Sequence, residues 1–305
     1  MHPFLLIPIY IFTGYFLKKT GIGKESLALW LNRIVINACL PSLALLKVPR
    51  LQASSALLLP ASVAWVVFFV AFLFVLVLSW RLCLDNSTKG SFLLCCGLFN
   101  SAFIGFPMVQ ALYGDHALSV AIITDQLGSF LVLSTAGLFA AAYYSGSHIS
   151  YKSFFARIFS FAPFWAFLIA LFLKFSDLEI PNMFNPILNF LSSLLTPLAL
   201  VAVGLQLNFL IDRNNVPILI KGLFYKLIIA PMIIFLIVLC LQSEHNLLLK
   251  KVCVIQSATP PMVSGSILAI RNRLNPPLSA AFVGIGIPLS FVTIPLWFIL
   301  LEIIF

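Results

Sequence analysis

Charged side chains are scarce in this sequence, and their scarcity excludes an ordinary soluble domain. Only 9% of the 305 residues are Asp, Glu, Lys or Arg, whereas 62% are apolar and the mean hydropathy is +1.11. A typical globular domain carries about 25% charged residues. Because a helix of about 20 apolar residues spans the hydrocarbon core of a bilayer, the composition predicts an all-α polytopic membrane protein.

Polar connections between the apolar runs are also short, which leaves no room for a soluble domain. The runs predict ten transmembrane helices, at 3–18, 27–46, 57–82, 91–113, 116–143, 155–175, 184–210, 216–241, 247–270 and 277–303. Met1 is followed at once by an apolar span, without a basic leader or a small-residue cleavage site, so no signal peptide is expected.

Motifs for metal, nucleotide or covalent chemistry are missing as well. The six cysteines form no CxxC pair, and the four histidines show no ligand spacing, so each cysteine is expected to be a small buried hydrophobe. The sequence contains no Walker A pattern. No nucleophile with a paired base is evident, so we expect neither an enzyme nor a bound metal or cofactor.

Basic residues outnumber acidic ones, and the net charge of +9 raises the question of whether the protein binds nucleic acid. The basic residues form no single patch and instead punctuate the loops. With the N-terminus outside, the inner loops carry thirteen Lys and Arg residues and the outer loops five. This asymmetry follows the positive-inside rule, so both termini are predicted to be non-cytoplasmic and nucleic acid is not an expected partner.

A repeated pattern of prolines and polar triplets divides the chain into two halves. Asn100-Ser101-Ala102 and Gln256-Ser257-Ala258 lie 156 residues apart. Three proline pairs recur at offsets of 155 to 157: Pro8 with Pro163, Pro41 with Pro197, and Pro60 with Pro217. Chance matching is the alternative, but the shared order favours a true repeat. We predict a first five-helix repeat over 1–144, a short cytoplasmic linker over 145–154 and a second repeat over 155–305.

The odd number of helices in each half determines how the halves are inserted. A unit of five crossings ends on the opposite side of the membrane, so the second copy is expected to be inverted. Inverted repeats are typical of secondary transporters, which bind substrate near the bilayer midplane between broken helices.

The fourth and ninth predicted helices are expected to be broken and to form the binding site. Gly105 and Pro107 interrupt the first, and Pro260 with Pro261 interrupts the second. Non-helical backbone at membrane depth survives only when it is buried or lines a cavity, and the new helix N-termini favour an anion. The predicted substrate-binding residues are Asn100, Ser101, Gly105, Pro107, Gln256, Ser257, Thr259, Pro260 and Pro261. The alternative is that the prolines only kink the helices and the amides cap freed backbone.

Asp125 and Lys226 are ionisable residues inside predicted spans that could contribute to the site. Asp125 lies about nine residues into the fifth span, where a charge costs roughly 2.5–3.5 kcal/mol on insertion scales. It is either a coupling group for a proton or cation, a partner of the broken helix, or a hydrogen-bonded packing residue. Lys226 precedes Pro231 in the eighth span. We favour snorkelling of Lys226 to the headgroups, with a place on the substrate path as the alternative.

Several stretches with a family pattern cover the chain nearly end to end: Gly14 to Gly21, Leu40 to Leu43, Asn100 to Pro107 with Tyr113 to Asp115, Thr196 to Leu200 with Gly204 to Leu207, Lys226 to Pro231, and Ala258 to Pro261. Together they resemble the auxin efflux carrier family, which includes plant auxin exporters and bacterial organic-acid permeases. The chain lacks the long hydrophilic central loop of the plant exporters, which favours the bacterial type and its inner membrane.

The resemblance implies a fold similar to bile-acid symporters and sodium/proton antiporters. It implies a scaffold made of helices 1, 2, 6 and 7, and a core domain made of helices 3–5 and 8–10 in which helices 4 and 9 cross. It also implies small organic anions as substrates.

The resulting hypothesis is a secondary carrier of small mono- or dicarboxylates or auxin-like acids. A membrane sensor that binds such a ligand without moving it is the alternative, and a channel is a third reading. The residues leave open whether a proton or sodium couples to transport, and whether the chain forms a homodimer.

Overall fold

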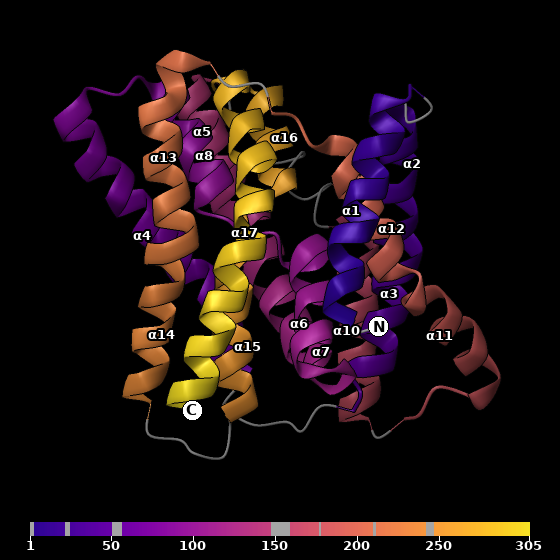
Figure 1. Ribbon diagram of the computed structural model, residues 1–305. Helices are drawn as coiled ribbons and strands as arrows, with labels where there is room; N and C mark the ends of the chain where they lie inside the picture. Colours follow the sequence, from indigo (N-terminus) through magenta and orange to yellow (C-terminus); the bar gives the residue numbers. More distant parts are fainter. Residues whose placement is uncertain are drawn as a thin grey trace. The chain divides into compact units, whose positions relative to one another are not determined.

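Helices make up nearly the whole of this chain. The computed structural model describes residues 3–21, 25–50, 57–147, 159–176, 178–209, 212–241 and 247–305 (Figure 1). Over these ranges the only β pairing is an isolated bridge between Phe99 and Pro261. The prediction of an all-α protein is therefore confirmed.

Six of the described helices are long and apolar enough to cross a membrane. They are Ser26–Lys47, Leu58–Leu82, Asp115–Ser145, Asn182–Gln206, Arg213–Cys240 and Pro276–Ile304. Shorter apolar helices lie at Ser101–Tyr113 and Ala162–Phe175. The count of ten spans and the inverted repeat stay predictions. Residues 148–154 of the predicted linker and the first residues of the sixth span lie outside the described part of the chain.

The chain forms two compact units, each drawing residues from both halves of the sequence. The first contains Met1–Ser55, Ala102–Ile122 and Phe155–Leu207, and the second contains Ala56–Ser101, Ile123–Phe154 and Asn208–Phe305. The helix runs Ser101–Gly105 and Leu118–Ile123 pass from one unit to the other.

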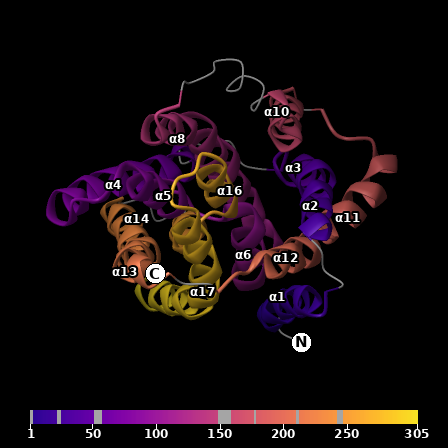
Figure 2. The same ribbon diagram turned by 90° about the horizontal axis from the view of Figure 1, so that it is seen from above.

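The first unit is a bundle built around the pair α1 and α12. Its elements are α1 (Pro3–Lys19), α2 (Glu25–Ile34), η1 (Val35–Cys39), α3 (Leu40–Lys47), α6 (Phe106–Tyr113), η4 (Asp115–Ala117), α10 (Ala162–Phe175), η7 (Asn182–Phe184), α11 (Asn185–Ser193) and α12 (Leu195–Gln206). The two helices lie side by side (Figure 2) because glycines face each other. A Cβ on Gly14 would overlap the carbonyl oxygen of Val201, and one on Gly204 would overlap that of Ile11. Small residues at both positions let the two backbones approach closely.

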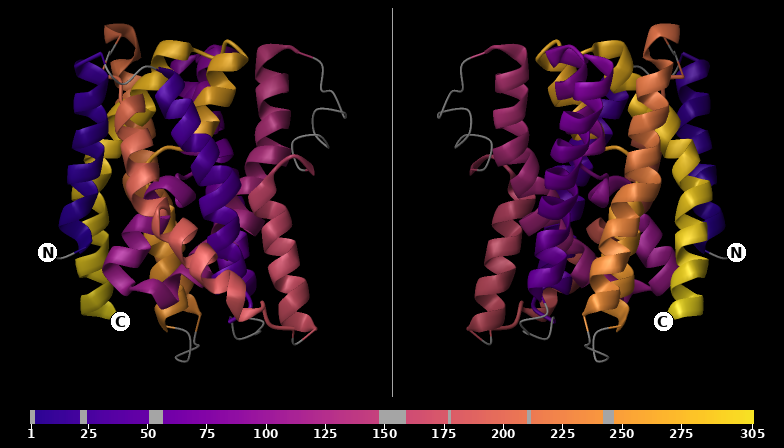
Figure 3. Two further views of the ribbon diagram at one scale, coloured as in Figure 1. Left: turned by 90° about the vertical axis from the view of Figure 1, so that its right-hand side faces the viewer. Right: turned by 90° about the vertical axis from the view of Figure 1, so that its left-hand side faces the viewer.

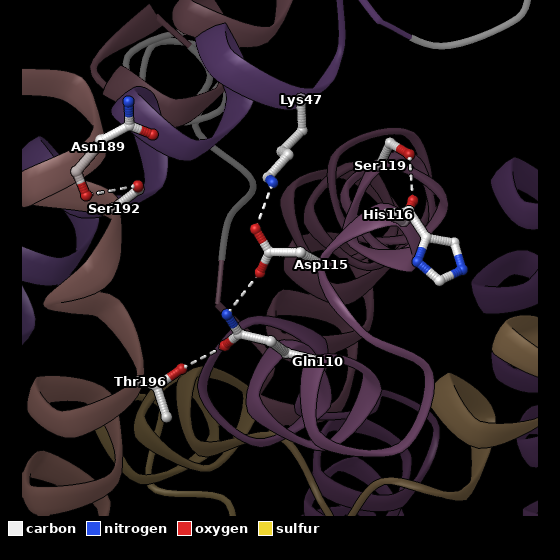
Figure 4. A network of polar contacts seen from close by, with 8 residues as sticks. All are labelled: Lys47, Gln110, Asp115, His116, Ser119, Asn189, Ser192 and Thr196. Carbon is white, nitrogen blue, oxygen red and sulfur yellow. Dashed lines mark hydrogen bonds and ion pairs between the residues drawn. The ribbon is translucent and has the colours of Figure 1, made fainter. Parts of the chain in front are cut away.

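A chain of polar contacts ties four elements of the first unit together (Figure 4). Lys47 Nζ lies 2.5 Å from Asp115 Oδ2, and Gln110 Nε2 donates to Asp115 Oδ1 at 2.7 Å. Thr196 Oγ1 donates to Gln110 Oε1 at 3.0 Å. The contacts join α3, α6, η4 and α12. The Lys47 and Asp115 side chains are 20% and 61% exposed, so the ion pair itself contributes little to stability.

The second unit contains the longest helices. Its elements are α4 (Leu58–Leu82), α5 (Asn86–Cys96), η5 (Thr124–Phe130), η6 (Leu133–Gly137), α8 (Leu138–Ser145), η8 (Arg213–Asn215), α13 (Val216–Phe224), η9 (Tyr225–Ile229), α14 (Ala230–Cys240), α15 (Leu247–Ala258), α16 (Val263–Arg271) and α17 (Pro276–Ile304). The run from α13 to α14 forms one continuous rod, orange in Figure 3. α16 lies against α5 and α17 (Figure 2).

Three of the prolines inside helical runs follow π-helical turns. η1, η3 (Ser101–Gly105) and η9 each end two residues before a proline, namely Pro41, Pro107 and Pro231. Proline lacks an N–H and its ring crowds the carbonyl four residues earlier, and the wider π turn relieves that contact without ending the helix. At Pro231 the freed carbonyl of Leu227 accepts a hydrogen bond from Trp297 Nε1 at 3.0 Å.

Candidate functional site

Two helix breaks cross inside the second unit. α5 ends at Cys96 and leads into the non-helical stretch 97–100, while α15 ends at Ala258 and α16 begins at Val263. The two stretches pair antiparallel at Phe99 and Pro261. Asn100 N donates to Pro260 O at 3.0 Å, and Met262 N donates to Cys95 O at 3.3 Å. We call residues 97–100 and 256–262, which include the last turn of α15, the crossover.

The backbone of the α15 side of the crossover is well satisfied. Thr259 donates to the carbonyl of Gln256 through both its backbone N, at 3.2 Å, and its Oγ1, at 2.7 Å. Lys226 Nζ donates to the carbonyl of Ser257 at 2.6 Å. Buried backbone groups without partners are costly, so these contacts explain how the break persists at membrane depth.

Two side-chain amides at the crossover are left unpaired. The side chains of Asn100 and Gln256 are buried, at 2% and 0% exposure. Asn100 Nδ2, Gln256 Nε2 and Gln256 Oε1 have no hydrogen-bond partner. Leaving such a group unsatisfied costs about 1–3 kcal/mol. The side-chain amides at the crossover therefore carry an energetic cost that the neighbouring, hydrogen-bonded backbone groups do not. The two donors and one acceptor are free to bind a polar ligand.

Asp125 is held beside the first break. It lies in η5, is 4% exposed, and accepts hydrogen bonds from Ser101 Oγ and from Gln126 Nε2, the latter at 2.7 Å. Gln126 Oε1 and Ser129 Oγ are buried without partners in the same element. Gln126 escaped sequence reasoning, although an amide next to an intramembrane carboxylate is itself a signal of a polar interior face.

The preference for snorkelling of Lys226 is wrong. Its side chain is fully buried, and its Nζ lies 5.3 Å from the centroid of the Phe99 ring in addition to its bond with Ser257 O. The carbonyl at the end of α15 and the face of the Phe99 ring both attract an ammonium group. Both lie within reach of the Lys226 side chain, so it binds them instead of extending to the headgroups. Lys226 therefore packs against the crossover from η9.

The predicted position of the first break is also wrong. Gly105 and Pro107 lie within the continuous helical run Ser101–Tyr113, and the chain leaves helical geometry earlier, at residues 97–100. The π turn Ser101–Gly105 absorbs the defect that Pro107 creates. The break at Pro260 and Pro261 is confirmed.

The structure gathers most, but not all, of the predicted site residues. Those in the second unit are Asn100, Ser101, Asp125, Lys226, Gln256, Ser257, Thr259, Pro260 and Pro261. Gly105 and Pro107 belong to the first unit. The expectation that every cysteine is buried is confirmed for Cys39, Cys95, Cys96 and Cys253 and is wrong for Cys83 and Cys240, which are exposed. Among the described residues, no cluster of three or more His, Cys, Asp or Glu could hold a metal ion.

Comparison with known proteins identifies the family of the chain. Residues 1–298 match the family described as membrane transport protein. An uncharacterized transporter of Methanothermobacter thermautotrophicus is 29% identical over 303 residues, covering 97% of both chains. The uncharacterized transporter MJ1031 of Methanocaldococcus jannaschii is 28% identical over 96% of both chains. The uncharacterized transporter YfdV of Escherichia coli K12 is 26% identical over 96% of this chain and 95% of its own length.

The family match spans nearly the whole chain, and the motifs that resemble auxin efflux carriers lie within it. Its apolar helices place the protein in the lipid bilayer. The chain is a multi-pass membrane protein and belongs to the auxin efflux carrier family of membrane transport proteins.

Proposed function

We propose that the protein is a secondary carrier of small organic anions, namely mono- or dicarboxylates or auxin-like acids. The observation that carries the proposal is a pair of buried amides at the crossover, in which Asn100 Nδ2 and both polar side-chain atoms of Gln256 lack partners. A hydrogen bond to a charged group is worth about 1.5–3 kcal/mol. A carboxylate accepting from Asn100 Nδ2 and Gln256 Nε2 would offset the cost of burying both donors.

Charge around the crossover favours an anion over a cation as the ligand. Lys226 supplies a buried positive charge next to Phe99 and Ser257. Asp125 already accepts two hydrogen bonds, from Ser101 and Gln126. Gln256 Oε1 is left to accept from a hydroxyl, a ring N–H or a protonated carboxyl of the substrate.

The proposed mechanism is alternating access by a core domain moving against a scaffold. Inverted five-helix repeats would place the crossover near the midplane, with both termini outside a bacterial inner membrane. In the proposed division, helices 1, 2, 6 and 7 form the scaffold. The compact units differ from this proposed division at one segment. Ala102–Ile122, which the division assigns to the core, belongs to the first unit.

Reconstitution tests the proposal directly. Proteoliposomes are assayed for uptake of labelled malate, malonate and indole-3-acetate, after a thermal-shift screen of organic acids for ligands that stabilise the folded protein. Asn100→Ala and Gln256→Ala should each reduce uptake of the identified substrate at least tenfold. Asn189→Ala, which alters an exposed amide on α11, is the matched control and should transport normally. Unchanged uptake in both crossover variants overturns the site, and tight binding without flux identifies a sensor.

Asp125 is the proposed proton carrier, with sodium as the alternative coupling ion. Its carboxylate contacts Ser101 at the edge of the crossover, so a change of its protonation would alter the first break. An inward proton gradient should stimulate uptake by the wild type and have no effect on Asp125→Asn. Equal gradient dependence in the two proteins excludes coupling through Asp125.

A further inference from the structure

Lys226 occupies an unusual place for a lysine in a membrane helix. It lies in η9, between α13 and α14, and is fully buried. Its Nζ donates to the carbonyl of Ser257 in the last turn of α15, at 2.6 Å, and faces the ring of Phe99 from 5.3 Å. The ammonium thus contacts both segments of the crossover, the α15 segment through the Ser257 carbonyl and the 97–100 segment through the Phe99 ring.

The end of α15 has the properties of a cation site. The last carbonyls of a helix carry partial negative charge and lack partners within the helix. In transporters with broken helices, such half-helix C-terminal ends coordinate the coupling cation. An aromatic face adds attraction for a desolvated cation. A small cation placed at Ser257 O beneath Phe99 would therefore be favoured, and the Lys226 ammonium is placed there.

The neighbouring carbonyls leave little for a second cation to bind. Gln256 O already accepts two hydrogen bonds from Thr259, and Pro260 O accepts one from Asn100 N. Ser257 O accepts from Lys226. No ion pair joins Lys226 to an acidic residue in the described part of the chain, so its contacts at the crossover are the carbonyl and the ring.

We propose that Lys226 is a built-in cation, whose ammonium takes the position at the end of α15 where a free coupling ion would otherwise bind. The crossover then needs no sodium ion at this position, because the Lys226 Nζ already donates to Ser257 O there. The inference deepens the proposed function, since it takes the crossover as the transport site and removes one of the two candidate coupling ions from it.

Thermal unfolding of the purified full chain tests this without knowledge of the substrate. The apparent midpoint is measured in sodium chloride and in choline chloride at equal ionic strength. The wild type should show no difference, because the position is filled. Lys226→Ala leaves a space ending at Ser257 O, so sodium or n-propylammonium, which replaces the lost atoms, should raise its midpoint by about 3 °C or more over choline.

Two further variants separate the proposal from a general loss of stability. Lys226→Met fills the space without a charge, so it should be less stable than the wild type and indifferent to sodium. Lys221→Ala removes a lysine of α13 outside the crossover and should behave like the wild type.

A saturable stabilisation of the wild type by sodium overturns the proposal, as does a Lys226→Ala protein that neither cation stabilises. If Lys226→Ala does not fold, the wild-type comparison decides alone. Because no transport is measured, failure to find a carried substrate would refute the proposed function and leave this result standing.

Discussion

Buried amides without hydrogen-bond partners oppose folding, so their presence needs a reason outside stability. Gln256 is fully buried and has neither its donor nor its acceptor paired. Gln126, in the same unit and 2% exposed, at least donates to Asp125 at 2.7 Å. Gln126 therefore serves the fold by binding Asp125, whereas the side chain of Gln256 is left available for a ligand.

Substituting leucine at these two glutamines should have opposite effects on stability. Gln256→Leu keeps most of the volume and removes unpaired polar atoms, so the apparent thermal midpoint should be unchanged or higher, by the equivalent of about 1–2 kcal/mol. Gln126→Leu strips a donor from the buried Asp125 and should lower the midpoint. Thermal unfolding of both purified variants measures this. A clear loss of stability in Gln256→Leu would show that the amide serves the fold.

At the scale of residues, local sequence patterns predict helix breaks only in part, and they do not predict partners that are distant along the chain. Pro260 and Pro261 located one break correctly because two consecutive prolines leave a helix no alternative. Pro107 misled, because a π turn lets a helix continue through one proline. The snorkelling of Lys226 was predicted wrongly because its partner, the carbonyl of Ser257, is 31 residues away along the chain. No local sequence pattern indicates that contact.

At the scale of elements, the crossover is held in place by the helices packed around it. α17 comes closest at Gly286, where an added Cβ would lie 2.5 Å from Pro261 Cδ and 3.0 Å from Leu223 Cδ2. The proline ring is fixed to the backbone, so it has little freedom to move aside. The absence of a side chain at Gly286 is therefore a requirement for α17 to support the crossover.

Gly286→Ala should destabilise the protein and disturb the crossover together. Overpacking of this kind costs about 1–3 kcal/mol, and displacement of Pro261 should also lower uptake of the identified substrate. Gly137→Ala is the matched control, because its Cβ would meet nothing closer than 3.4 Å and alanine favours helical geometry. Thermal midpoints and uptake are compared for the two variants. Equal behaviour would mean that α17 moves away from Pro261 without cost.

At the scale of the whole molecule, hydropathy predicted where most helices lie, since burial in lipid demands long apolar runs. It did not predict how the helices divide into units, because unit membership depends on which faces pack together. Ala102–Ile122 shows this, since it follows the first break in sequence and belongs to the first unit. An apolar composition predicts that the chain lies in a membrane, whereas the grouping of its helices into units depends on tertiary contacts.

Orientation in the bilayer is a whole-molecule property that two exposed cysteines can report. Cys83 follows α4 and Cys240 ends α14, and both side chains are exposed, whereas the other four cysteines are buried. The excess of basic residues in alternate loops predicts that Cys83 lies on the cytoplasmic side and Cys240 on the outer side. The native chain therefore carries one reporter for each side.

A membrane-impermeant maleimide applied to intact cells should modify Cys240, and Cys83 should react only after permeabilisation. Labelled peptides identified by mass spectrometry distinguish the two sites, and Cys83→Ser with Cys240→Ser supplies the controls. Reaction of Cys83 in intact cells, with Cys240 protected, would invert the orientation and place both termini inside. Arg33 and Lys226 lie within helices. Without them the inner loops still carry eleven basic residues against five outside, so the predicted orientation does not depend on these two residues.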